Sequence, residues 1–205
     1  TSLSHNRVWS IAHTRDGSLW VATSNGLNRM EMGNPGRFKR YYHQPGVEGS
    51  LNDSLVRNLL VGYRQNLWVG TESGLMELDI ESEIFKSHEP PNKPIDAAIT
   101  RIRDAEDGQI WVGSQKGLYL FNPLDNQFIP LVSEYNYALL SHDDIRDMQK
   151  DDSGILWVTT RYAGLIKVKL SPGIFNNYTK YQTLENEAHN VGSVYSLYQD
   201  YRGVI

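Results

Sequence analysis

The chain has no cysteine, no long apolar run and no excess of positive charge. The missing cysteines exclude disulfides and thiolate chemistry. No apolar stretch approaches the ~20 residues of a membrane-spanning helix, and no signal peptide is recognisable. A net charge of −4 and a pI of about 5.8 give no electrostatic reason to expect nucleic acid as a partner. The composition, 40% hydrophobic over 205 residues, provides ample material for a folded core.

What the chain does contain is a fourfold repeat. Each copy has an apolar residue, a tryptophan, a valine and two small residues, followed within a few positions by Gly-Leu. The tryptophans lie 48, 43 and 46 residues apart, at Trp20, Trp68, Trp111 and Trp157. A period of this size is typical of a repeat architecture and decides the fold class.

The spacing extends well beyond the tryptophan. Two apolar residues stand twelve and nine positions before it in every copy: Val8 and Ile11, Val56 and Leu59, Ile99 and Ile102, Ile145 and Met148. A phenylalanine follows seventeen or eighteen positions after it: Phe38, Phe85, Phe128 and Phe175. Tight turns such as Asp16-Gly17 precede the tryptophan. Each copy therefore predicts four short strands, carrying in order the apolar pair, the tryptophan, the Gly-Leu and the phenylalanine.

Four-stranded units of this length stack face to face as propeller blades. We therefore predict an all-β chain, a β-propeller of four-stranded antiparallel blades that forms an incomplete arc of four blades plus the start of a fifth. One partial propeller domain spans 1–205, with blades at approximately 3–47, 48–93, 94–138 and 139–188 and a partial blade at 189–205. In the partial blade Val194 and Leu197 match the first-strand positions, and the next tryptophan would be residue 206. The sequence thus indicates a piece of a longer protein.

The repeated unit resembles the two-component regulator propeller repeat. The resemblance rests on Leu-Trp-Val-Gly-Thr followed by Gly-Leu, seen in full at residues 67–75, and it covers essentially the whole chain. It implies a periplasmic ligand-sensing propeller, the extracytoplasmic part of an inner-membrane hybrid histidine kinase or diguanylate cyclase. The membrane and output segments are absent from this sequence. The motif is more distantly similar to streptogramin-type lyase propellers.

Because the repeated residues are structural, recognition is expected where the copies differ, in loops on a rigid scaffold. In a propeller the connections between blades and the turns between second and third strands lie on one face, at the mouth of the central channel. Arginine suits carboxylate or sulfate, and aromatic rings suit sugars. The candidate ligand-binding residues on this face are Arg7, Trp9, Arg57, Arg101, Arg146, Arg161, Tyr162 and Tyr195. The alternative is that the arginines pair with neighbouring acids such as Asp53, Asp144 and Asp147.

We find no pattern for catalysis, a metal ion or a cofactor. No nucleophile elbow, phosphate loop or paired catalytic carboxylates are present. His5, His142 and His189 fall in connections between blades, but without the close pairing of a metal site they are interpreted as polar loop residues. Asp151-Asp152-Ser153-Gly154 lacks the downstream glutamate of a calcium loop and is interpreted as a turn.

Three functions are compatible with this pattern. The first is a non-enzymatic sensor module that binds a small molecule or oligosaccharide at the mouth, where Arg57, Arg101 and Arg146 are expected to cluster, give positive charge and favour anionic ligands. The second is a propeller platform for protein–protein contact or dimerisation, and the third is a propeller lyase or glycosidase. An open arc exposes an apolar sheet face at each end, so we also expect a homo-oligomer. A membrane partner is expected only through the absent parts of the protein.

Overall fold

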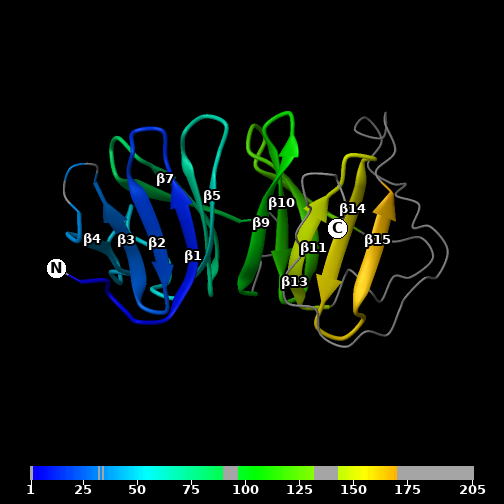
Figure 1. Cartoon of the computed structure of the whole chain (residues 1–205), viewed down its shortest axis with the longest axis horizontal. Coiled ribbons are helices and arrows are strands. Elements are labelled where there is room, and N and C mark those ends of the chain that lie inside the picture. The colour runs from blue at the N-terminus through cyan, green and yellow to red at the C-terminus, as the bar shows by residue number, and fades with distance from the viewer. Residues whose placement is uncertain (1, 32, 34, 90–96, 132–142, 170–205) are drawn as a thin grey trace.

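The computed structural model describes residues 2–31, 33, 35–89, 97–131 and 143–169, and these form fifteen strands and no helix. The strands make four antiparallel sheets in sequence order, ranged one after another in Figure 1. Blade 1 contains β1 (Val8–His13), β2 (Leu19–Thr23), β3 (Gly26–Met30) and β4 (Lys39–Tyr41). Blade 2 contains β5 (Val56–Val61), β6 (Leu67–Thr71), β7 (Gly74–Asp79) and β8 (Ile84–His88).

Blade 3 contains β9 (Ile99–Glu106), β10 (Gln109–Ser114), β11 (Gly117–Asn122) and β12 (Gln127–Pro130). Blade 4 contains β13 (Ile145–Lys150), β14 (Ile155–Thr160) and β15 (Leu165–Lys169). Its predicted fourth strand, around Phe175, lies outside the described residues, as does the partial blade. Every described strand lies inside one of the four repeat units that the sequence predicted.

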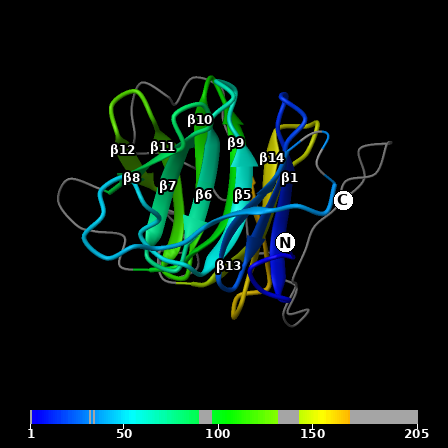
Figure 2. The ribbon, with the colours of Figure 1, turned by 90° about the vertical axis from the view of Figure 1, so that its left-hand side faces the viewer.

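The first strands of successive blades are neighbours. β1 contacts β5, β5 contacts β9, and β9 contacts β13. Each second strand also contacts the first strand of the next blade. In Figure 2 the strands of blade 2 run from β8 at the outside to β5 toward the inside. This is the arrangement of propeller blades, and the described sheets do not close a ring.

The motif tryptophans occupy equivalent positions, and three of the four are buried as predicted. Trp20, Trp68 and Trp111 lie in the cores between sheets. Trp157 is half-buried, in a blade whose fourth strand lies outside the described residues. Its indole N–H donates to Asp151 Oδ2 at 2.8 Å, and Lys167 Nζ lies over the ring. The Trp157 ring thus makes polar contacts at its edge and on one face.

The small residue two places after the tryptophan lets the next sheet approach closely. A Cβ added to Gly70 would lie 2.8 Å from Ile99 Cγ2, and one added to Gly113 would lie 2.7 Å from Ile145 Cγ2. Contacts this short leave no room for a side chain. At these two interfaces the absence of a side chain on the glycine therefore permits the close spacing of the blades.

Blade 1 presents the same apolar pair, and no sheet of the described residues covers it. Val8 is 41% exposed and Ile11 is 63% exposed, whereas their counterparts in blades 2 to 4 are all buried: Val56 and Leu59, Ile99 and Ile102, Ile145 and Met148. The first face of the arc is therefore an apolar surface, as the sequence predicted.

Candidate functional site

One face of the arc is built from the connections between blades and the turns between second and third strands. Backbone hydrogen bonds join these two segments in every blade: Ser24 N to Arg7 O, Glu72 N to Leu55 O, Gln115 N to Ala98 O and Arg161 N to Asp144 O. In each turn a Thr or Ser hydroxyl also donates to the carbonyl of the motif glycine, as Thr71 does to Gly74 at 3.1 Å. The loops of the candidate face are thus fixed by the repeat itself.

A β-bulge near the start of each first strand directs one side chain out of the regular ladder. The pairing shifts between Val8 and Ser10, and at the equivalent place in the other three blades. The bulged residues are Trp9, Arg57, Thr100 and Arg146. Bulges commonly re-aim a side chain beside a functional site. Arg101 follows the bulge of its blade, so it occupies the position of Asn58 rather than that of Arg57.

Arg57 is paired within its own blade. Its Nη2 lies 2.5 Å from Glu72 Oε2, and its Nε donates to the same oxygen at 2.6 Å. Asp53, named in the alternative interpretation, instead accepts hydrogen bonds from the Leu55 N–H and the Ser73 hydroxyl. The acid that neutralises Arg57 therefore comes from the turn and not from the connection.

Arg101 and Arg103 extend from blade 3 to a buried acid of blade 4. Asp147 Oδ1 lies 3.4 Å from Arg101 Nε and 2.8 Å from Arg103 Nη2. Burial lowers the pKa of Arg101, although Asp147 acts in the opposite direction. Arg146 is close enough to Arg101 to repel it. Asp147 is therefore a shared counterion that links two blades.

Asp144 serves two arginines of blade 4. Its Oδ2 lies 2.9 Å from Arg146 Nη2 and 3.8 Å from Arg161 Nη1. Its Oδ1 is buried and has no hydrogen-bond partner among the described residues. Burial raises the pKa of Asp144, against the effect of these arginines and of Arg57. Arg57 of blade 2 and Asp144 of blade 4 are thus close enough to interact electrostatically on this face.

Two aromatic residues complete the set. The guanidinium groups of Arg7 and Arg57 lie 5.2 Å and 5.3 Å from the centroid of the Trp9 ring, whose N–H donates to Ser24 Oγ. Arg161 lies 5.3 Å from the ring of Tyr162, which is 76% exposed. Both rings thus face guanidinium groups, and the ring of Tyr162 is the more exposed to solvent.

The sequence interpretation predicted that Arg57, Arg101 and Arg146 give the mouth positive charge. In the structure each is ion-paired, although Asp144 and Asp147 are each shared between two arginines. The alternative interpretation, in which the arginines pair with neighbouring acids, is correct for Asp144 and Asp147. Arg103 was missed, although its spacing of two from Arg101 places both side chains on one side of a strand. Four features of the sequence lie outside the described residues: Tyr195, His142, His189 and the proline-rich segment at 90–94.

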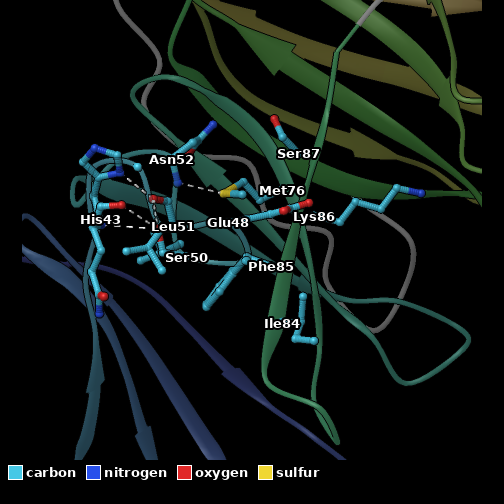
Figure 3. A pocket seen from close by; sticks show the side chains of 14 residues that line it. His43, Glu48, Ser50, Leu51, Asn52, Met76, Ile84, Phe85, Lys86 and Ser87 are labelled. Atoms are coloured by element: carbon cyan, nitrogen blue, oxygen red, sulfur yellow. Dashed lines mark hydrogen bonds between the residues drawn. The ribbon is translucent and has the colours of Figure 1, made fainter.

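A cleft away from the candidate face lies on the outer side of blade 2. This cleft of about 650 Å³ lies between the connection 43–52 and β8. In Figure 3 His43, Ser50 and Leu51 lie on one side of it, across from Ile84 of β8. None of the predicted binding residues lines it. The connection 43–52 is hydrogen-bonded to the edge strand β8, where Phe85 N donates to Gly49 O at 3.0 Å.

Within the described ranges, no group of three His, Asp or Glu side chains is placed to hold a metal ion. In that part of the chain there is also no helix long and apolar enough to cross a membrane.

The first repeat matches a known family. Residues 2–25 match the family described as two component regulator propeller. This match includes Trp20 and both apolar positions of the first strand, which are among the residues on which the resemblance rests. No curated protein matches the chain.

Solved propeller structures resemble the whole arc at low identity. The extracellular domain of the hybrid two component system BT4673 from B. thetaiotaomicron is 16% identical with a TM-score of 0.71, over 99% of this chain and 26% of that one. Virginiamycin B lyase from Staphylococcus aureus is 14% identical with a TM-score of 0.61, over 92% and 60%. An auxiliary nutrient binding protein from Bacteroides thetaiotaomicron is 9% identical with a TM-score of 0.60, over 86% and 40%.

The chain spans about a quarter of the length of the first of these structures. At such identities the likeness shows the fold, and the family match adds the type of repeat. The chain is therefore a β-propeller arc whose first repeat matches the two component regulator propeller family.

Proposed function

We propose that this chain belongs to the extracytoplasmic sensor region of a bacterial membrane signalling protein and binds a small polyhydroxylated ligand, in the first place an oligosaccharide, at the mouth. One observation carries this proposal. Paired arginines and carboxylates alternate on the candidate face beside the exposed ring of Tyr162.

Such a set suits hydroxyl groups, since each sugar hydroxyl both donates and accepts a hydrogen bond. The arginines supply donors, and the Glu72 carboxylate, whose side chain is 40% exposed, supplies an acceptor. Arg57, Arg101 and Arg146 each already face a carboxylate of Glu72, Asp147 or Asp144, so we place neutral ligands before anionic ones.

The cellular setting rests on the family match and the structural likeness. The family is named for two-component regulators, and one similar structure is an extracellular domain of a hybrid two component system. We therefore assign an extracytoplasmic location and a signalling role, with kinase or cyclase as the output. Although a lyase shares the fold, the acids of the mouth are engaged in ion pairs, which fits binding better than acid–base catalysis.

Calorimetric titration of the folded chain with neutral and uronic-acid oligosaccharides tests this proposal. We expect binding of neutral oligosaccharides that weakens at least tenfold in Asp144→Asn and in Tyr162→Ala. Arg64→Ala is the matched control, because Arg64 lies in the turn between β5 and β6 and stacks on the neighbouring Tyr63. No binding of either class by the folded chain, or binding that all three variants leave unchanged, would contradict the proposal.

A second candidate is a platform for self-association, favoured by the exposure of Val8 and Ile11. Apolar residues on an uncovered sheet face promote association. Light scattering at tens of micromolar should then show a dimer or larger species that becomes monomeric in Ile11→Lys. A monomer in the unmodified chain would refute this candidate and leave the sensor proposal untouched.

A further inference from the structure

The turn between third and fourth strands reaches back onto the preceding blade. In blade 2 the last turn residue is Glu83, and in blade 3 it is Asn126. Both directly precede their fourth strand and both have a positive φ, +58° and +55°. The two side chains are therefore structural equivalents at successive interfaces.

Their partners are equivalent as well. Glu83 accepts a hydrogen bond from the Tyr41 hydroxyl at 2.9 Å, and Asn126 Oδ1 lies 2.8 Å from His88 Nδ1. Tyr41 pairs with Leu27 and His88 pairs with Leu75, which are the residues that follow the motif glycines. Each interface is thus closed at its periphery by the same pair of positions, which we call the outer latch.

The two outer latches differ in chemistry. The first is ionic, because Glu83 also pairs with Lys39 and with Arg29, the latter at 3.3 Å. The second is centred on His88, which is 2% exposed. Its ring lies 5.2 Å from the centroids of both Trp68 and Phe121, one from each blade.

Both nitrogens of the His88 ring face oxygen atoms. Nδ1 faces Asn126 Oδ1, and Nε2 lies 2.9 Å from Glu77 Oε2. The Asn126 amide has its orientation set, because its Nδ2 donates to the Glu89 carbonyl at 3.3 Å. A neutral imidazole has one N–H, so only an imidazolium donates to both oxygens. We propose that His88 is a buried imidazolium that latches blade 2 to blade 3, and that its deprotonation loosens this interface.

The groups that face the His88 ring come from four strands. β7 contributes Glu77, and β8 contributes Lys86, which interacts with Glu77 electrostatically. The strands β6 and β11 contribute the rings of Trp68 and Phe121. The hydrogen bond from His88 lowers the pKa of Glu77, which keeps this carboxylate ionised beside the ring. A buried ion pair of this kind is costly to break from one side only.

Nitrogen-15 spectra of the histidine rings test the protonation state directly. At pH 6 we expect His88 to show two protonated nitrogens in the unmodified chain and one in Glu77→Gln. A single neutral tautomer of His88 at pH 6 in the unmodified chain would overturn the proposal.

Unfolding at several pH values tests the latch. The neutral His88 ring keeps only one of the two hydrogen bonds of the imidazolium, so the latch should weaken as pH rises and the ring is deprotonated. From pH 5.5 to 8.5 the folding constant of the unmodified chain should fall about tenfold more than that of His88→Gln. His13→Gln, at an exposed position, is the control and should keep the unmodified slope. Equal slopes in the unmodified chain and His88→Gln would contradict the latch.

Discussion

Trp20 and Trp111 occupy equivalent positions in their blades, but their indole N–H groups differ. Trp20 Nε1 donates to Thr14 Oγ1 at 3.2 Å, whereas Trp111 Nε1 is buried without a hydrogen-bond partner among the described residues. A buried donor without a partner costs free energy that a hydrogen-bonded donor does not.

Substituting phenylalanine at these two positions should therefore have unequal effects. Both variants lose part of a buried ring, but only Trp20→Phe also breaks a hydrogen bond. We expect Trp20→Phe to reduce the free energy of unfolding by about 1 kcal/mol more than Trp111→Phe. Urea denaturation of the two variants checks this, and an equal or larger loss in Trp111→Phe would contradict the assignment.

Gly70→Ala should destabilise the interface between blades 2 and 3. The new Cβ would meet Ile99 Cγ2 at 2.8 Å, and overpacking of this kind costs about 1–3 kcal/mol. The double variant Gly70→Ala, Ile99→Ala removes the Cγ2 atom that the new Cβ would meet, so it should lose less stability in denaturation experiments than the sum of the two single variants. A neutral Gly70→Ala would show that the glycine does not set the spacing.

Asp16, in the tight turn of blade 1, should make the free energy of unfolding depend on pH in the acid range. Burial alone would raise the pKa of Asp16, but hydrogen bonds from Thr14, Ser18 and Arg29 outweigh it and hold the pKa well below its usual range. A lowered pKa gives stability that is present above the unfolded value and is lost as pH falls.

Asp16→Asn removes the titrating group and tests this directly. Between pH 5 and pH 2 the free energy of unfolding should fall less steeply in Asp16→Asn than in the unmodified chain. At pH 7 the variant should be the less stable of the two. Parallel pH profiles would show that Asp16 does not contribute in this way.

The blades could be predicted because their determinants are local and repeated. The apolar pair fixes the first strand, and the Thr71 hydroxyl with Gly74 fixes the turn after the second. The same repetition correctly predicted the exposed face at Val8 and Ile11.

The ion pairs and latches could not be predicted in the same way, because they join residues that only the stacked blades bring together. Asp147, for example, lies in the first strand of blade 4, and only the packing of that strand against blade 3 brings it to Arg101 and Arg103. Likewise, nothing in the local sequence of His88 indicates that Asn126 of the next blade will face its ring.

Locating a bound oligosaccharide tests the central claim most directly. Each arginine side chain gives its own Nε–Hε signal in nitrogen-15 spectra, so a titration reports which guanidinium groups contact the ligand. We predict that the signals of Arg57, Arg101, Arg103, Arg146 and Arg161 shift together with one dissociation constant. Arg29 and Arg64 lie away from the mouth and should not move. A ligand that binds the folded chain but leaves all five mouth signals in place would contradict the account.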